Sequence, residues 1–203
     1  MAIFQRSAAL SRWAFLALAG AALTLPGCRQ PARPRGTATV VPTYDQKTGK
    51  LQGITYDRNK DSRPDAWLFM DGTKPVRAEL DDNYDGAVDR WEHYQANGSV
   101  AQTGPMPLGE LVKAEQSTRF DGNVSRWETY EHGTLTRVAE DTSGDLRPDK
   151  WETWTDGSLV EVALDTKGAG KPDRKLLYPS EGGSPQMLVD TKGDGAFQPV
   201  AQP

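Results

Sequence analysis

The sequence predicts an all-β protein, a repeat array of antiparallel β-hairpins that form a meander and are joined by acidic loops. Four tryptophans, Trp67, Trp91, Trp127 and Trp151, recur at steps of 24, 36 and 24 residues. Acidic residues and glycine turns keep the same step. Self-similarity at a fixed period of about 20 to 50 residues is typical of repeat architectures. The repeat unit is therefore 24 residues long.

Each unit contains an acidic loop, a Trp-Glu-x-aromatic segment, a glycine turn and a run of apolar and β-branched residues such as 159–164. Asparagine and glycine accept the positive φ that tight hairpin turns need, so each unit reads as one hairpin. A helix over 89–96 is the alternative, but that segment is short and bounded by glycines. The expected turns are Asp71-Gly72, Asn97-Gly98, His132-Gly133 and Asp156-Gly157.

The ends of the array, which extends over residues 37–203, are expected to be atypical, as in stacked repeats with capping units. Residues 40–44 and 51–56 predict a first hairpin that no acidic loop precedes. The last unit, from Asp190, has a loop without a hairpin. The 36-residue step predicts an inserted loop near 103–114, which is rich in proline and glycine. Together these units predict a meander of about ten strands.

The N-terminus predicts an export signal over residues 1–27. Arg6 and Arg12 precede an apolar stretch that runs into Leu-Pro-Gly-Cys at 25–28. This stretch is shorter than the roughly 20 residues that cross a bilayer. The alternative is an ordinary secretory signal followed by an incidental thiol.

The segment at 25–28 resembles the lipobox of bacterial lipoproteins. The resemblance implies cleavage before Cys28, which is the only cysteine in the chain, and attachment of a lipid to its sulfur. Residues 28–36 would then form a lipidated cysteine and a flexible tether rich in proline and arginine. Arg29 stands where the family's inner-membrane retention signal has an aspartate. We therefore expect a lipid-anchored protein of the bacterial cell envelope, at the outer rather than the inner membrane.

Composition and charge argue against several classes of protein. Removing residues 1–27 takes away two of the 24 basic residues and none of the 28 acidic ones, which leaves a formal charge of −6. This charge disfavours a nucleic-acid partner. Hydrophobic residues make up 36% of the whole chain, so the core must be thin or distributed along the repeats. No nucleophile, zinc or phosphate-loop motif occurs, and the carboxylates recur by period, so we expect no enzyme.

One acidic loop fits a twelve-residue calcium loop at every informative position. Such a loop supplies oxygens at positions 1, 3, 5 and 9, a glycine at the bend and a glutamate at position 12 that closes the shell around Ca²⁺. Here Gly86 stands at the bend. The candidate ligands are Asp81, Asn83, Asp85, Asp89 and Glu92.

Five further loops match less completely. A second candidate site has Leu146 at the bend and comprises Asp141, Ser143, Asp145, Asp149 and Glu152. A third lacks both the glycine and the closing glutamate and comprises Asp57, Asn59, Asp61 and Asp65. The remaining three carry Arg119, Lys167 and Lys192 at position 3 of the loop, where a ligand oxygen is expected. We expect no ion in these three, where either the side-chain cation replaces the metal or the loop has decayed.

The loops resemble the EF-hand-like loops of dockerins and thrombospondin type 3 repeats, as a pattern over residues 57–195. The resemblance implies Ca²⁺ as a cofactor. True EF-hands need a helix on each side, for which a 24-residue unit leaves no room. The alternative is simple turn chemistry, in which Asp, Asn and Gly cap strand ends.

The aromatic residues of the repeats predict a ladder along the sheet, formed by Trp67, Trp91, Trp127, Trp151, Phe69, Tyr94, Tyr130 and Trp154. Same-column aromatics are usually cross-strand or core pairs. The alternative is an exposed platform that stacks on sugar rings or binds a protein.

Three functional hypotheses follow from these observations. The first is a membrane-anchored lipoprotein with a calcium-binding β-repeat domain, acting as a surface or periplasmic binding and spacer module. The second is a cation-independent repeat protein that binds polysaccharide or a partner protein through an aromatic face. A hydrolase that uses an acid pair such as Asp85 and Asp89 is the third.

Overall fold

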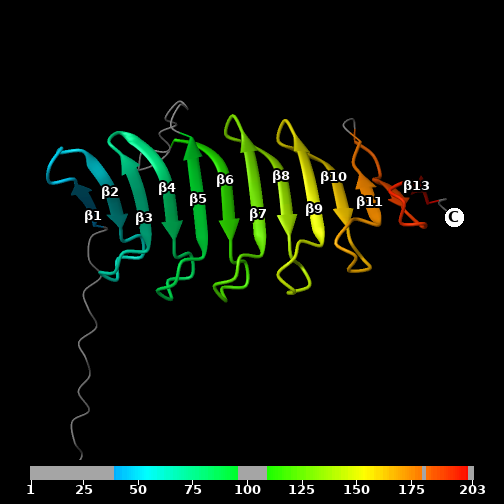
Figure 1. Cartoon of the computed structure of the whole chain (residues 1–203), viewed down its shortest axis with the longest axis horizontal. Coiled ribbons are helices and arrows are strands. Elements are labelled where there is room, and N and C mark those ends of the chain that lie inside the picture. The colour runs from blue at the N-terminus through cyan, green and yellow to red at the C-terminus, as the bar shows by residue number, and fades with distance from the viewer. Residues whose placement is uncertain (1–38, 96–108, 180–181, 201–203) are drawn as a thin grey trace, which may run out of the picture. The chain divides into compact units, whose positions relative to one another are not determined.

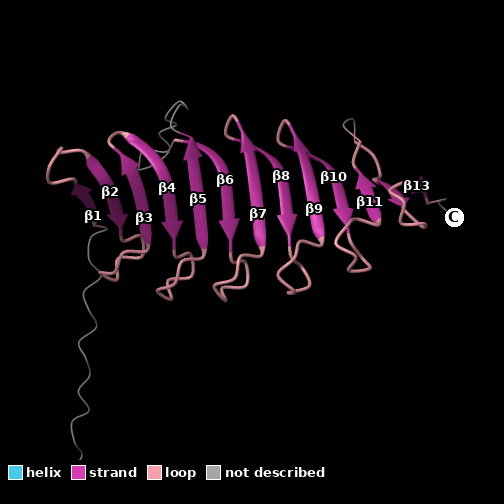
Figure 2. Ribbon diagram, in the orientation of Figure 1, coloured by secondary structure: helices cyan, strands magenta, loops and turns pink. Residues whose placement is uncertain are grey.

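The computed structural model describes residues 39–95, 109–179 and 182–200. The backbone divides into two units, 1–33 and 34–203, and every described residue belongs to the second. The expected export signal, Cys28 and the tether therefore lie outside the described residues. Within the described ranges the chain consists of strands and loops, with no helix (Figure 2) and hence none that could span a membrane.

The described residues confirm the all-β fold and the meander. Thirteen antiparallel strands follow one another in sequence order within one sheet (Figure 1). Short hairpin turns lie along one edge, and the acidic loops lie along the other. The strands are β1 (Val40–Tyr44), β2 (Leu51–Tyr56), β3 (Ala66–Asp71), β4 (Lys74–Leu80), β5 (Arg90–Gln95), β6 (Glu110–Gln116), β7 (Arg126–Glu131), β8 (Thr134–Glu140), β9 (Lys150–Thr155), β10 (Ser158–Leu164), β11 (Arg174–Leu177), β12 (Gln186–Val189) and β13 (Gln198–Pro199).

The hairpin turns between β7 and β8 and between β9 and β10 form where the sequence predicts them. His132 and Gly133 have φ values of 51° and 73°, and Asp156 and Gly157 have 51° and 76°. Two consecutive positive φ angles define a type I′ turn, whose twist matches that of the flanking strands. The turn predicted at 71–72 is wrong by one residue, because Asp71 pairs with Lys74 and the turn comprises Gly72 and Thr73. The predicted turn at 97–98 lies outside the described residues.

The first hairpin is confirmed as β1 and β2, but two other expectations about the strands are wrong. The strand count exceeds ten because the C-terminal segment adds β11, β12 and β13. Residues 110–114, which we expected in an inserted loop, belong to β6. Leu111-Val112-Lys113-Ala114 carries the same alternation as Pro75-Val76-Arg77-Ala78 of β4, so this segment belongs to the repeat.

The strand register divides the side chains between two faces. Trp67, Trp91, Trp127 and Trp151 share one face, here called the tryptophan face, because each pairs directly with a residue of the strand between them. Neighbouring positions in a strand point to opposite sides. The adjacent Glu92, Glu128 and Glu152 therefore lie on the other face, here called the glutamate face.

The hydrophobic core is local rather than continuous. Ile54, Leu68, Met70, Ala78 and Tyr94 form one buried cluster near the N-terminal end of the sheet, on the glutamate face. Farther along this face, glutamates alternate across the strands with small or β-branched residues, in the order Glu92, Ala114, Glu128, Val138, Glu152 and Val162. The thin core expected from the composition thus lies over β2–β5, and polar contacts take over beyond it.

Each edge strand contains a proline. Pro42 lies in β1 and Pro199 in β13. Proline cannot donate a hydrogen bond to an added strand, which discourages pairing with another chain. Val40, Val41 and Tyr44 of β1 are nevertheless exposed.

Candidate functional site

The first and ninth positions of the acidic loops hold the loop backbone in place. In the loop from Asp81 to Asp89, the Oδ2 of Asp81 accepts a hydrogen bond from the N–H of Gly86 at 2.8 Å. The Oδ1 of Asp81 accepts one from Asp85 at 3.2 Å. The Oδ2 of Asp89 accepts from the N–H groups of Asp82 and Asn83 at 2.9 and 3.2 Å. Both aspartates are buried.

The same hydrogen bonds from loop N–H groups to an aspartate carboxylate, here called caps, occur in loops that depart from the calcium pattern. The carboxylate of Asp165 accepts hydrogen bonds from the N–H groups of Ala169 and Gly170 at 3.0 and 2.6 Å. Asp190 accepts from Gly193 and Gly195 at 2.7 and 2.8 Å. Both of these loops have a lysine at position 3, where the calcium pattern has a ligand oxygen. The position-1 aspartate therefore closes the loop whether or not the calcium pattern is present.

The other two candidate loops are built in the same way. Asp141 accepts from the N–H of Gly144 at 2.6 Å and of Leu146 at 3.0 Å, and Asp149 accepts from Thr142 and Ser143. Asp57 accepts from Lys60 and Ser62, Asn59 from Asp61, and Asp61 from Arg63. Asp145 accepts from Arg147. Leu146 and Ser62 have φ values of 69° and 74°, so both adopt the left-handed bend that Gly86 adopts at 97°.

Burial raises the pKa of Asp141, but the N–H groups of Gly144 and Leu146 and the guanidinium of Arg119 outweigh it. The net pKa of Asp141 lies below its ordinary value. Asp149 shows the same balance, with burial opposed by hydrogen bonds from Thr142 and Ser143. Both carboxylates are therefore stabilised in their charged form by the loops they close.

The two closing glutamates of the calcium pattern lie within strands and not in the loops. Glu92 accepts a hydrogen bond from the Nε of Arg90 at 2.8 Å and another from the hydroxyl of Tyr94. Glu152 pairs with Lys150 at 2.8 Å and accepts a hydrogen bond from the indole of Trp154 at 3.0 Å. Position 12 of the calcium pattern thus falls in the strand after the loop, where each glutamate shares a face with the residues two before and two after it.

No group of three or more His, Cys, Asp or Glu side chains in the described residues is arranged to hold a metal ion. The oxygens at positions 1 and 9 already accept backbone hydrogen bonds, and the position-12 glutamates have partners on the sheet. Calcium binding by these loops stays a prediction.

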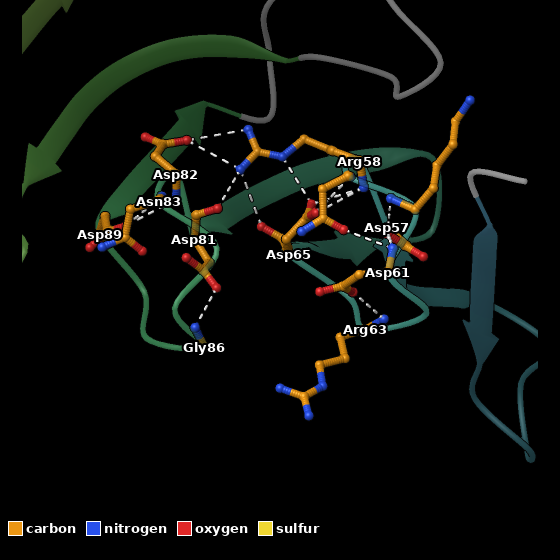
Figure 3. Close-up of polar contacts among 12 residues, drawn as sticks. Asp57, Arg58, Asp61, Arg63, Asp65, Asp81, Asp82, Asn83, Gly86 and Asp89 are labelled. Carbon is orange, nitrogen blue, oxygen red and sulfur yellow. Dashed lines mark hydrogen bonds and ion pairs between the residues drawn. The ribbon is translucent and has the colours of Figure 1, made fainter. Parts of the chain in front are cut away.

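Side-chain cations connect successive loops. The guanidinium of Arg58 donates to Asp65 in its own loop, and to the carbonyl of Asp81 at 2.7 Å and the carboxylate of Asp82 at 3.2 Å in the next loop (Figure 3). Arg119 reaches the carbonyl of Asp141 at 3.0 Å and its carboxylate at 3.1 Å. The Nζ of Lys171 donates to the carbonyl of Gly193.

The three cations at position 3 of the degenerate loops, expected either to replace the metal or to mark a decayed loop, behave differently from one another. Arg119 lies 3.5 Å from Asp121 in its own loop and pairs more closely with the next loop. Lys167 lies 3.7 Å from Asp173. For Lys192 no ion pair is present among the described residues. Arg58 and Lys171, which the sequence analysis did not single out, make equivalent connections between loops.

The glutamate face carries a connected row of ion pairs. Glu128 lies between Arg126 at 2.8 Å and Arg90 at 3.0 Å, the latter reaching across β6 above the fully buried Ala114. Burial raises the pKa of Glu128, but the hydrogen bonds from Arg126 and Tyr130 and the charge of Arg90 bring it below its ordinary value. The row continues through Glu140, Lys150 and Glu152. This face is thus occupied by its own partners.

The expected ladder of eight aromatics is divided between the two faces. Phe69 shares the tryptophan face with the four repeat tryptophans, while Tyr94, Tyr130 and Trp154 lie on the glutamate face, because an offset of three from Trp91, Trp127 or Trp151 reverses the side. Tyr130 and Trp154 hydrogen-bond the glutamates of that face.

A groove opens on the tryptophan face between Trp127 and Trp151. Directly between successive tryptophans lie Glu79, then Glu115, and then Ala139. Where alanine replaces glutamate, a hollow of about 380 Å³ remains, lined by both tryptophans. Thr129, Arg137 and Thr153 form the next row of its lining. The two tryptophans are half-buried, so part of each indole is open to solvent.

No family model matches the chain, and no curated protein matches it in sequence. Among solved structures, that of accessory secretory protein 1, 2 and 3 in Streptococcus pneumoniae is similar over 62% of this chain, with a TM-score of 0.30 and 12% sequence identity. This chain spans 19% of the length of that chain. Function is therefore inferred from the side chains of this protein alone.

Proposed function

We propose that this protein is a lipid-anchored binding module of the bacterial cell envelope, whose tryptophan face binds a polysaccharide or a partner protein. The β-repeat domain acts as the spacer that presents this face, and the lipid on Cys28 supplies the attachment. The proposal requires no catalysis, because the carboxylates of the chain are distributed by repeat among structural contacts.

The groove between Trp127 and Trp151 is the observation that carries the proposal. Its volume of about 380 Å³ falls within the roughly 300–1,000 Å³ of small-molecule sites. Aromatic side chains supply a large apolar area that stacks on flat partners. On the glutamate face of the described residues, the charged groups pair with one another.

The calcium-binding version of the module differs only in what stiffens the loops. Backbone hydrogen bonds to Asp81, Asp89 and their equivalents, together with the cations that connect successive loops, hold the loops in place in either version.

A binding screen with matched variants tests this proposal. The full-length chain is applied to an array of neutral and acidic bacterial polysaccharides, in parallel with Trp127→Ala, Trp151→Ala and Trp67→Ala. Trp67 is the control, because Glu79 rather than alanine lies beside it. We expect the first two variants to lose binding and Trp67→Ala to keep it. Equal binding by all three variants, or no binding to any glycan or envelope protein, would contradict the proposal.

A further inference from the structure

The cations of the tryptophan face differ in one respect from repeat to repeat. In β4, Arg77 pairs with Glu79 at 3.0 Å, and in β6 Lys113 pairs with Glu115 at 2.7 Å. Arg77 also covers the ring of Phe69, 4.2 Å from its centroid. In each strand the acid stands two residues after the base, on the same face.

The corresponding base of β8, Arg137, has no acidic residue two positions after it. Arg137 is followed two residues later by Ala139, and Arg137 is exposed. Among the described residues, none makes an ion pair, a hydrogen bond or a cation–π contact with its guanidinium. One replacement, glutamate by alanine, therefore both opens the groove between the tryptophans and leaves an uncompensated guanidinium at its border.

We propose that this groove binds a uronic acid residue of an acidic polysaccharide, with the sugar ring between Trp127 and Trp151 and its carboxylate on Arg137. The inference rests on the proposed function and names the ligand of that site. A guanidinium presents parallel N–H donors that match a carboxylate in a bidentate pair. The ligand's carboxylate thus occupies the place that Glu79 and Glu115 occupy beside the other two bases.

The spacing of the two tryptophans suits a ring between them. They lie two strands apart, which is about 9.6 Å at the usual strand separation. A ring midway between them would lie about 4.8 Å from each tryptophan, within the roughly 4.5–7 Å range of packed aromatic partners. Ala139, directly paired with both tryptophans, leaves the space between them free.

The remaining lining suits a sugar better than a peptide. Thr129 and Thr153 are the direct cross-strand neighbours of Arg137, so a threonine stands on each side of this residue. The carboxylate of a uronic acid stands on C5, between the ring oxygen and the oxygen on C4, and both are acceptors for threonine hydroxyls. An extended peptide gains affinity by main-chain pairing at a sheet edge, whereas the backbones of β7, β8 and β9 already pair with one another.

Isothermal titration of the full-length chain with uronic acid oligomers tests the inference. The probes are trimers of galacturonic, glucuronic and mannuronic acid, each compared with its neutral hexose trimer. The variants are Arg137→Met, which keeps the apolar stem, and Ala139→Glu, which restores the glutamate of the neighbouring repeats. Lys113→Met is the matched control, because it removes a base that already has an acid. Thermal unfolding of each variant verifies that the fold is intact.

We expect at least one acidic trimer to bind, with affinity that falls about tenfold or more in Arg137→Met, as expected for loss of a charge-assisted pair. Ala139→Glu should abolish binding, and Lys113→Met should preserve it. Equal affinity for neutral and acidic trimers would overturn the assignment to uronic acids while leaving the proposed function in place. Binding of a polyglutamate peptide through Arg137, with no trimer bound, would overturn the sugar as ligand. Insensitivity of all binding to Trp127→Ala and Trp151→Ala would overturn the proposed function as well.

Discussion

Replacing Asp81 with alanine removes the carboxylate that closes the loop between β4 and β5. Its carboxylate accepts hydrogen bonds from the backbone N–H of Asp85 at 3.2 Å and from that of Gly86 at 2.8 Å. The residue is 3% exposed, so the carboxylate is held in place by its surroundings. We expect Asp81→Ala to destabilise the protein in the absence of any metal ion.

The size of the loss follows from the two hydrogen bonds. Bonds to a charged acceptor contribute about 1.5–3 kcal/mol each. Gly86 is exposed, so water can satisfy its freed N–H, and the loss should lie near the low end, at about 3 kcal/mol in total. For a domain of this length that corresponds to a lowering of Tm by roughly 6–12 °C.

Thermal unfolding followed by far-ultraviolet circular dichroism, in excess chelator at neutral pH, measures this loss. Hydrogen exchange of the Gly86 amide localises it, because repeat arrays can open one unit at a time. Asp85→Ala is the matched control: its carboxylate is exposed and accepts from Ala87 and from the amide of Asn83. Asp85→Ala should lower the free energy of unfolding much less than Asp81→Ala does.

Two results would refute this reasoning. One is a parent-like melting curve for Asp81→Ala in chelator, with unchanged exchange at Gly86. The other is an equal loss of unfolding free energy in Asp81→Ala and Asp85→Ala. This result would mean that burial of the Asp81 carboxylate does not decide how much it stabilises the loop.

Four further predictions follow. The pKa values of Asp141 and Asp149 are lowered, so both residues contribute fully to the free energy of unfolding above the unfolded aspartate pKa of about 3.9 and lose that contribution as pH falls below it. Tm values measured at pH 7, 4 and 2.5 should therefore decline only on the acidic side. Glu128→Gln should cost about 1–2 kcal/mol in urea unfolding, because it leaves Arg90 and Arg126 under-compensated, whereas no loss would show that the ionic row is dispensable. Calcium at a hundredfold over its dissociation constant should add roughly 2.7 kcal/mol per occupied loop, and identical melting with calcium and with chelator would exclude it. Cys28→Ser should move the protein from the detergent phase to the soluble fraction or leave the precursor uncleaved; a native chain without lipid by mass spectrometry would contradict the anchor.

Much of the fold could be predicted because it depends on local rules repeated at a fixed period. The type I′ turns at 132–133 and 156–157 follow from residues that accept positive φ. The first hairpin matches its predicted bounds of 40–44 and 51–56. Ends and interruptions were harder, because β6 follows a long insertion and β11 has Lys175 where the period places a tryptophan.

The sequence determines the candidate sites less closely, because a spacing in sequence is compatible with more than one geometry. Glu92 stands twelve residues into its loop, but its strand directs it to Arg90 and Tyr94. The connections made by Arg58 and Arg119 join residues 22 to 24 apart, a separation that the repeat period implies only once the loops are known to lie side by side.

The sequence by itself determined the repeat period and the turns at 132–133 and 156–157, because a turn depends on the few residues that form it. Tertiary structure decided which side chains share a face, since a strand reverses sides at every residue and one shift in register exchanges the faces. It also decided that Trp127 and Trp151 border a groove, because the space between them depends on the residue of an intervening strand. Ala139 in place of a glutamate is visible in the sequence, but its effect on Arg137 and the two tryptophans exists only after β7, β8 and β9 have paired.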